Sequence, residues 1–290
     1  MRKNCLKACV FMAVSLLIVS CGSKKFDTSK SISVTTREDG SGTKGAFMEI
    51  LGLKGKADVK DVVVATGTAA VMEEVKNNNY SIAFDSLGYV TDDVKKMKVD
   101  GVEPTTTNIK NGSYSISRPL NVIYKEDTVK NSVLLTTYLE FLNSKDAQEI
   151  ISKNGYVVPI DSTTSYTANP TLSGKISISG STSLQPLMIL LSAKYEEIQS
   201  KVTVEVSGGG SGTGYSNGEK GVSDFGMISE VFNSTKAPSC VFYTVAKDGI
   251  AIIVNKENTY NSITKGQLKS IYNSEEADAT KIKFWSDLEK

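Results

Sequence analysis

One pattern constrains the fold of this chain more than any other: a β-branched run followed by a glycine- and serine-rich loop. It occurs three times, and the loops read REDGSGT at 37–43, GSTS at 180–183 and SGGGSGTG at 207–214. Helical apolar spacing follows the first two loops. Strands that alternate with helices in this way predict an α/β fold with mainly parallel sheets.

Further short runs continue the same alternation. We expect strands at residues 62–65, 81–84 and 249–254. We expect helices at residues 69–76, 129–143, 145–153 and 265–272. The stretch 161–173 is rich in Ser and Thr and has no hydrophobic periodicity, so it is predicted to be a linker.

The first twenty residues stand apart from this pattern. Three basic residues precede an apolar run at 8–19 that is short for a membrane span and typical of a signal peptide. The run ends in IVSCG, which resembles a bacterial lipobox with Cys21 as the lipidated residue. We therefore expect a signal peptide at 1–20, a lipid-anchor tether at 21–30 and attachment to the extracytoplasmic face of the cell membrane. A plain secretory signal is the alternative.

Cleavage before Cys21 would also determine the cysteine content and charge of the mature chain. It would remove Cys5 and Cys9 and leave Cys240 without a disulfide partner, so Cys240 is predicted to be a small buried residue. Losing three of 33 basic residues leaves 30, against 32 acidic residues. This balance, with lysines spread along the chain, gives no support for nucleic-acid binding.

The glycine loops suggest recognition of an anion. A helix N-terminus carries unsatisfied N–H groups and partial positive charge, and glycines let an anion approach the backbone closely. One such loop is often purely steric, but open α/β sheets bring several together beyond their strand ends. Arg37 adds a rigid fork of donors suited to a tetrahedral oxyanion, and Asp39 could hold that fork in position. The alternative is an exposed Arg37–Asp39 ion pair of little energetic weight.

Enzymatic chemistry has less support. The chain contains no histidine, and no phosphate-loop pattern GxxxxGK[ST] follows its predicted strands. A serine nucleophile would need a lysine or carboxylate base, and no Cys and His cluster suits zinc. We expect no enzyme, no metal and no cofactor. A surface phosphoester hydrolase using Ser41 or Ser211 is the alternative, and a surface sensor or adhesin is another.

Taken together, the motifs resemble the phosphate-binding lipoproteins of bacterial phosphate ABC importers. The RxDGSGT element at 37–43 is the most specific. The others are GSTSLQP at 180–186, GGGSGTG at 208–214, SDFGM at 223–227, IAF and SLGY within 82–89, SRPL at 117–120, GYVVP at 155–159 and FWSDL at 284–288. The resemblance implies a two-lobed, type II periplasmic-binding-protein-like fold, with two mainly parallel sheets joined by a two-strand hinge. It also implies capture of inorganic phosphate between the lobes and delivery to a membrane permease.

The motifs do not follow that family's usual order, in which the GSTS-like segment comes first and the GYVVP-like segment lies near the C-terminus. This order predicts a circular permutation, which is tolerated where chain ends lie close together at a surface. The permuted lobes would comprise 31–117 plus 247–290, carrying RxDGSGT, and 118–246, carrying GSTS and GGGSGTG. The chain would cross between them near 117–121 and 245–250.

The length of the linker at 161–173 bears on the oligomeric state. About 13 residues span roughly 40 Å when extended, which is ample to join neighbouring termini within one molecule. We therefore expect a monomer. An exchange of lobes between two chains is the alternative.

The resemblance also implies which residues surround the anion. They are Arg37, Ser41, Gly42, Thr43, Ser183, Leu184 through its amide, and Ser211, with Gly40 and Thr182 in support. Ser229 stands where some members of the family place an aspartate that accepts the proton of hydrogen phosphate. A hydroxyl does not repel sulfate as a carboxylate would, so sulfate or another tetrahedral oxyanion is the alternative ligand. Glu230 or Asp39 could be the substitute acceptor.

Overall fold

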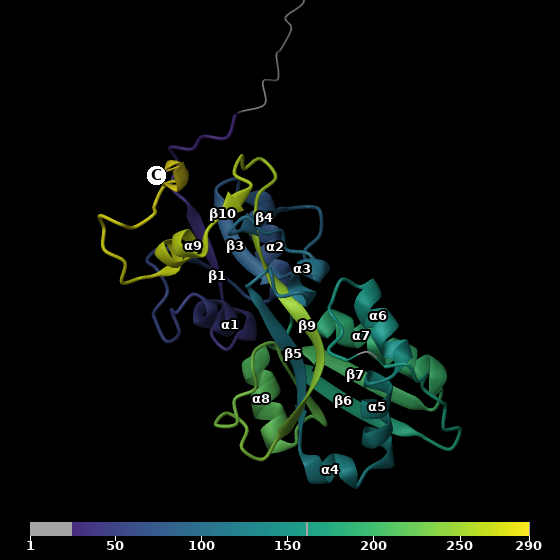
Figure 1. Cartoon of the computed structure of the whole chain (residues 1–290). Coiled ribbons are helices and arrows are strands. Elements are labelled where there is room, and N and C mark those ends of the chain that lie inside the picture. Colours follow the sequence, from purple (N-terminus) through teal and green to yellow (C-terminus); the bar gives the residue numbers. More distant parts are fainter. Residues whose placement is uncertain (1–24, 161, 290) are drawn as a thin grey trace, which may run out of the picture.

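The computed structural model describes residues 25–160 and 162–289, which form two lobes joined by two long strands (Figure 1). The first lobe contains β1 (Ser33–Arg37), β2 (Val63–Ala65), β3 (Ser81–Ser86), β4 (Lys95–Val99), β10 (Ser262–Ile263), α1 (Gly42–Ile50), α2 (Thr68–Asn77), α3 (Thr106–Lys110), α9 (Lys265–Tyr272) and η1 (Trp285–Glu289). The second contains α4 (Glu126–Lys130), α5 (Val133–Leu142), α6 (Lys145–Lys153), α7 (Gln185–Ile198), α8 (Ser211–Lys220), β6 (Gly174–Gly180), β7 (Val202–Gly208) and β8 (Phe225–Ile228). The connecting strands are β5 (Ser117–Tyr124) and β9 (Val241–Val254). The predicted signal peptide and Cys21 lie outside the described residues.

The strands form one hydrogen-bonded path in the order β2-β1-β3-β9-β5-β8-β6-β7. Pairing is parallel among β1, β2 and β3 and among β6, β7 and β8, but antiparallel wherever β9 takes part. Residues 241–249 of β9 pair with β5, and residues 250–254 pair with β3. The α/β class is therefore confirmed, but the ladder runs on through the connecting strands where two separate sheets were expected.

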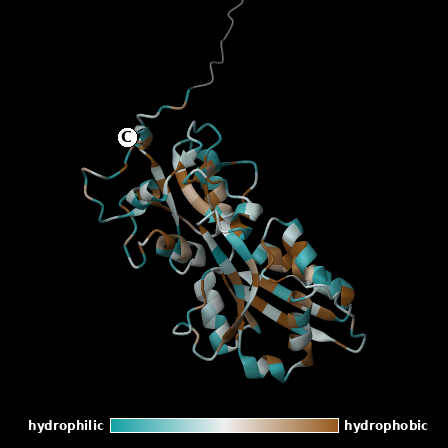
Figure 2. Ribbon diagram, viewed as in Figure 1, coloured by the Kyte–Doolittle hydropathy of each residue, from teal (hydrophilic) through white to brown (hydrophobic). Residues whose placement is uncertain are grey.

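Each lobe has a hydrophobic core of its own. In the first lobe Phe47 stacks on Phe84 with ring centroids 4.0 Å apart, and Trp285 is fully buried. In the second, Tyr138 and Tyr195 pack edge to face with ring centroids 4.9 Å apart. Figure 2 shows the apolar residues gathered along the strands and the inner sides of the helices. The polar region between the two cores is therefore the natural place for a site.

Most predicted elements are present, but two predictions need correction. The helix expected at 129–143 is divided into α4 and α5, because Ser132 starts a new helix by accepting a hydrogen bond from the Leu135 amide. The tether expected at 21–30 is not wholly free of the fold, because Phe26 is buried against Trp285 and Tyr80. One aromatic residue in a polar segment is enough to dock it on the core.

Two further predictions concern the linker and Cys240. Residues 162–173 contain no helix or strand, although Tyr166 packs against the core of the second lobe. Cys240 is buried and free, as expected, and burial raises the pKa of its thiol to about 11. In the described part of the chain, no helix is both long and apolar enough to cross a membrane.

Candidate functional site

The three glycine loops each connect a strand to a helix, as the pattern predicted. REDGSGT joins β1 to α1, GSTS joins β6 to α7, and SGGGSGTG joins β7 to α8. Ser41 caps α1 by accepting a hydrogen bond from the Lys44 amide at 3.3 Å. Gly40 and Gly210 adopt φ angles of 84°, a left-handed conformation that favours glycine.

Residues of these loops meet where the lobes touch. Thr43 Oγ1 of the first lobe lies 2.8 Å from Ser183 Oγ of the second. The Gly212 amide donates to the Gly40 carbonyl at 2.9 Å. The sequence predicted that these loops converge, and the structure brings them into direct contact.

Ser211 and Ser229, both from the second lobe, lie next to this contact and bond each other. Ser211 Oγ accepts a hydrogen bond from the Ser229 amide at 3.0 Å, and the two hydroxyl oxygens are 3.3 Å apart. Gly42 faces them so closely that an added Cβ would lie 2.3 Å from Ser211 Oγ and 2.8 Å from Ser229 Oγ. Only glycine at position 42 allows the lobes to approach this far. We call Arg37, Thr43, Ser183, Ser211 and Ser229, all buried, the inner contact zone.

Arg37 is the one cation of the inner contact zone, and its neighbour Glu38 holds it. Arg37 Nε donates to Glu38 Oε2 and Nη2 donates to Glu38 Oε1, both at 2.9 Å. Nη2 also donates to Thr182 Oγ1 across the lobes at 3.0 Å. Burial raises the pKa of Glu38, but the hydrogen bonds and charge of Arg37 together with backbone amides such as that of Gly67 outweigh burial, so the pKa is lowered overall.

The prediction that Asp39 holds the guanidinium is therefore wrong. Its side chain is 99% exposed and accepts a hydrogen bond from Lys44 Nζ at 2.9 Å. The reason is local: the chain turns at Asp39 and Gly40 and carries this carboxylate to the outside. Because it is exposed, Asp39 is also not placed to be a buried proton acceptor for the anion.

The other predicted residues have clear places. Leu184 is buried at the start of α7, and its amide donates to Ser181 Oγ at 3.2 Å. Glu230 Oε1 accepts a hydrogen bond from Lys236 at 2.7 Å, and its other oxygen would lie 2.7 Å from a Cβ on Gly45 of α1. Glu230 therefore lies between the lobes but outside the inner contact zone.

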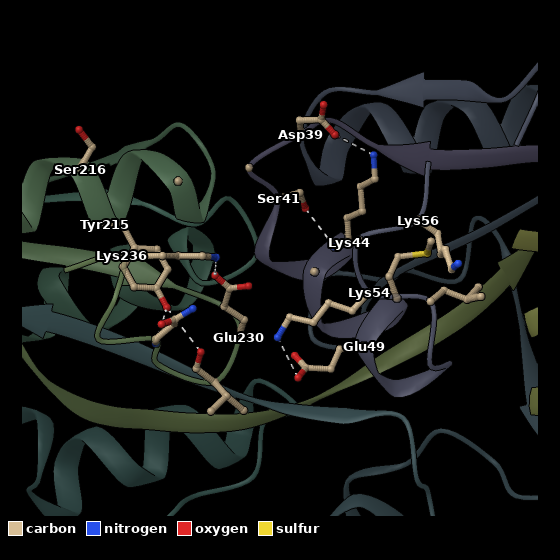
Figure 3. A pocket seen from close by; sticks show the side chains of 18 of the residues that line it. Asp39, Ser41, Lys44, Glu49, Lys54, Lys56, Tyr215, Ser216, Glu230 and Lys236 are labelled. Carbon is tan, nitrogen blue, oxygen red and sulfur yellow. Dashed lines mark hydrogen bonds and ion pairs between the residues drawn. The ribbon is translucent and has the colours of Figure 1, made fainter. Parts of the chain in front are cut away.

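Glu230 and Asp39 line a groove of about 700 Å³ at the mouth of this zone. Figure 3 shows Asp39, Ser41, Lys44, Glu49 and Lys54 on the side of α1, opposite Tyr215, Glu230 and Lys236 on the side of α8. We call this the mouth groove. Several of its charges are paired: Lys44 with Asp39, Lys54 with Glu49, and Lys236 with Glu230.

Sequence reasoning missed a fourth loop of the same kind. It joins β2 to α2 at residues 65–68. Its Gly67 amide donates to Glu38 Oε2 at 3.1 Å, and Thr68 Oγ1 donates to the Thr182 carbonyl at 3.4 Å. The sequence ATGT after the apolar run 62–64 is the signal that could have revealed it.

Sequence reasoning also missed a buried group of charges at the connecting strands. Arg118 Nη2 of β5 lies 3.2 Å from Asp248 Oδ2 of β9, and Arg118 Nη1 donates to the Ser229 carbonyl at 3.0 Å. Asp85, at the end of β3, is fully buried with its Oδ1 3.8 Å from Arg37 Nη1. Charged residues inside otherwise apolar strands signal such partners, because burial of an unpaired charge is costly.

Two lobes, joined by two strands and lined with donors where they meet, define a two-lobed solute-binding protein. A family model described as PBP superfamily domain matches residues 24–146 and 165–290. Phosphate-binding protein PstS 2 of Streptococcus agalactiae is 35% identical over 284 residues, covering 94% of each chain. The chain therefore belongs to the PBP superfamily and, within it, to the family of these phosphate-binding proteins, which confirms the resemblance read from the motifs.

Two further comparisons agree. PstS 2 of Streptococcus pneumoniae serotype 4 is 32% identical over 92% of this chain and 94% of its own. The crystal structure of a phosphate ABC transporter, phosphate-binding protein from S. pneumoniae TIGR4 superposes with a TM-score of 0.71 at 30% identity, covering 89% of this chain and 100% of that chain. The predicted periplasmic-binding-protein fold is thus shown.

The circular permutation stays a prediction. The S. agalactiae relative aligns through 94% of both chains and so has the same order of segments. Phosphate-binding protein PstS of Bacillus subtilis, at 36% identity, aligns over 120 residues, or 40% of this chain and 38% of its own.

Proposed function

We propose that this protein captures inorganic phosphate between its lobes and delivers it to an ABC importer. One observation carries the proposal: loops far apart in the sequence place buried hydroxyl groups and a single arginine at the contact between the lobes. Hydrogen bonds to a charged partner are roughly twice as strong as neutral ones. An anion held there would exchange neutral hydroxyl pairs for charge-assisted bonds. The names of the relatives support phosphate as that anion.

We assign ligand contacts to the residues that sequence reasoning selected. They are Arg37, Ser41, Gly42, Thr43, Ser183, Leu184, Ser211 and Ser229. In this proposal Thr43 and Ser183 approach the anion from opposite lobes, and so do Gly42 and Ser211. A ligand that is held from both sides favours the closed arrangement. Entry then requires the lobes, 31–117 with 247–290 and 118–246, to separate by bending β5 and β9.

The proposed role is binding rather than turnover. Ser41 Oγ caps α1, and Ser211 Oγ is engaged by the Ser229 amide and hydroxyl. Lys44 Nζ, the basic group nearest to Ser41 in sequence, is bonded to Asp39 and Asp58. Among the described residues, the hydrogen-bond partners of these two hydroxyls include neither a lysine amine nor a carboxylate, one of which a serine nucleophile would need as its base.

We further propose that Cys21 carries a lipid that anchors a monomer to the extracytoplasmic face of the membrane. The charged residues 24 and 25 would then separate the lipid from Phe26, the first residue docked on the fold. The permease of the importer would be the protein partner. Mass spectrometry of the processed N-terminus tests the anchor directly.

The function is tested by titration calorimetry of the purified chain with phosphate, followed by competition with excess sulfate. We expect saturable binding of phosphate at one site per monomer. If sulfate displaced phosphate at a concentration similar to that of phosphate, the proposed ligand would be any tetrahedral oxyanion rather than phosphate. No binding at millimolar phosphate would reject the proposal.

A further inference from the structure

Among the described residues, several buried polar atoms without a hydrogen-bond partner belong to a group of charged residues near the connecting strands. They are Arg37 Nη1, Asp85 Oδ2 and Arg118 Nε. The carboxylate of Asp85 interacts electrostatically with Arg37, Arg118 and Asp248. The hydroxyl of Tyr156 interacts with Ser86, Arg118 and Asp85. Buried polar groups normally find partners, so a cluster of unmet ones points to a bound group.

Within this cluster one donor and one acceptor stand out. Arg37 uses Nε and Nη2 on Glu38 and Thr182, but Nη1 has no partner. Asp85 Oδ1 accepts from the Ser86 amide at 2.7 Å, but Oδ2 has no partner. Nη1 and Oδ1 are 3.8 Å apart, beyond hydrogen-bonding distance.

The free Nη1 of Arg37 is the donor that a bound anion would use, and such an anion would then lie beside Asp85. Two negative groups in a buried site cannot both stay ionised without a large cost. The groups that face Asp85 are Arg37 from β1, Arg118 from β5, Asp248 from β9 and Tyr156 from the segment after α6. Both cations already have carboxylate partners, Glu38 and Asp248. The cost is relieved if Asp85 becomes neutral.

We propose that Asp85 is a further residue of the anion site and takes up a proton when an anion binds Arg37. The proton comes from the solvent and converts the carboxylate to a carboxyl group, and no bond within the anion changes. The new O–H then donates to the anion, which satisfies Oδ2. This inference rests on the function proposed above and adds to it a residue from the end of β3.

The ionisation of Asp85 suits this role. Burial raises its pKa to about 7, against the opposing charge of Arg37. Asp85 is therefore ionised in mildly alkaline solution before the anion arrives, and an adjacent anion raises its pKa further. Binding that takes up a proton weakens as the pH rises, by up to about tenfold per pH unit.

The test is calorimetry with phosphate at about pH 8.5, where nearly all free phosphate is the dianion, in two buffers of different ionisation enthalpy. The difference in heat counts the protons taken up. We expect the wild type to take up close to one proton more than Asp85→Asn. Asp85→Glu should keep the uptake, because it keeps a carboxyl group. Asp92→Asn is the control, because that carboxylate is fully exposed.

Each other outcome has a defined meaning. Equal proton uptake by wild type and Asp85→Asn overturns the inference and leaves the proposed function intact. Loss of uptake in Asp248→Asn with uptake retained in Asp85→Asn also overturns it, because the proton would then belong to the hinge pair. Absence of phosphate binding by the wild type removes both proposals together. If Asp85→Asn does not fold, carbon-13 NMR of the Asp85 carboxyl in the wild type decides: no change on adding phosphate overturns the inference.

Discussion

The inner contact zone and the mouth groove lie next to each other between the same two lobes, yet they differ in how their charges are used. The groove is lined by lysines and carboxylates paired with one another, such as Lys54 with Glu49, and many of them are exposed. The inner zone holds hydroxyl groups and one arginine that keeps a nitrogen without a partner. Exposed ion pairs contribute little, whereas a buried free donor is available for a ligand. The comparison indicates that the inner contact zone recognises the ligand, whereas the charges of the mouth groove mainly interact with each other and with water.

The largest expected effect comes from removing the buried cation. Arg37→Ala should weaken phosphate binding by about 1.5 to 3 kcal/mol, or roughly 10- to 150-fold, the range for a charge-assisted hydrogen-bonding group. Titration calorimetry measures it. Lys54→Ala in the groove is the control and should change the affinity less than about twofold. An equal loss of phosphate affinity in both variants would show that the two regions contribute equally to recognition.

The second effect tests the close approach at Gly42. A methyl group there would meet Ser211 and Ser229 across the lobes, so Gly42→Ala should disfavour closure and weaken phosphate binding about tenfold. Gly266→Ala is a matched control at the start of α9, where the nearest atom to a new Cβ lies 3.7 Å away. Small-angle scattering with and without phosphate reports closure directly. An unaffected Gly42→Ala would show that the lobes do not approach this closely when phosphate is bound.

The third effect separates two adjacent carboxylates. Glu38→Gln loses one charged acceptor for Arg37 and should weaken phosphate binding by about three- to fivefold, because the guanidinium is then held less firmly. Asp39→Asn should change the affinity less than about twofold, since that side chain is exposed and bonded to Lys44. The opposite ranking in calorimetry would restore Asp39 as the partner of Arg37.

The smallest effect concerns the far wall of the groove. Lys236→Ala breaks the pair with Glu230 and removes a cation 4.9 Å from the ring of Tyr215. We expect phosphate affinity to change less than about twofold and the melting temperature to fall by only a few degrees. A tenfold loss of affinity in Lys236→Ala would mean that the groove takes part in recognition.

Much of the fold and part of the site could be predicted from sequence. Hydrophobic periodicity gave the positions of most strands and helices, because each of these signals lies within one segment. The glycine loops were recognised for the same reason, since helix capping and left-handed turns are local properties. The convergence of Thr43 with Ser183 could be anticipated from the loops they belong to, although the residues are 140 positions apart.

The partners of buried charges were decided by the tertiary structure alone. Glu38 and Asp39 are equally plausible partners for Arg37 along the chain, and only the turn at Gly40 separates them. Arg118 meets Asp248 because β5 and β9 pair antiparallel, and Asp85 approaches Arg37 because β3 lies beside β1. Local preferences are encoded within a few residues, but the environment of a buried charge depends on which distant strands become neighbours. That is why the sequence determined the loops, and the assembled sheet determined which charges they meet.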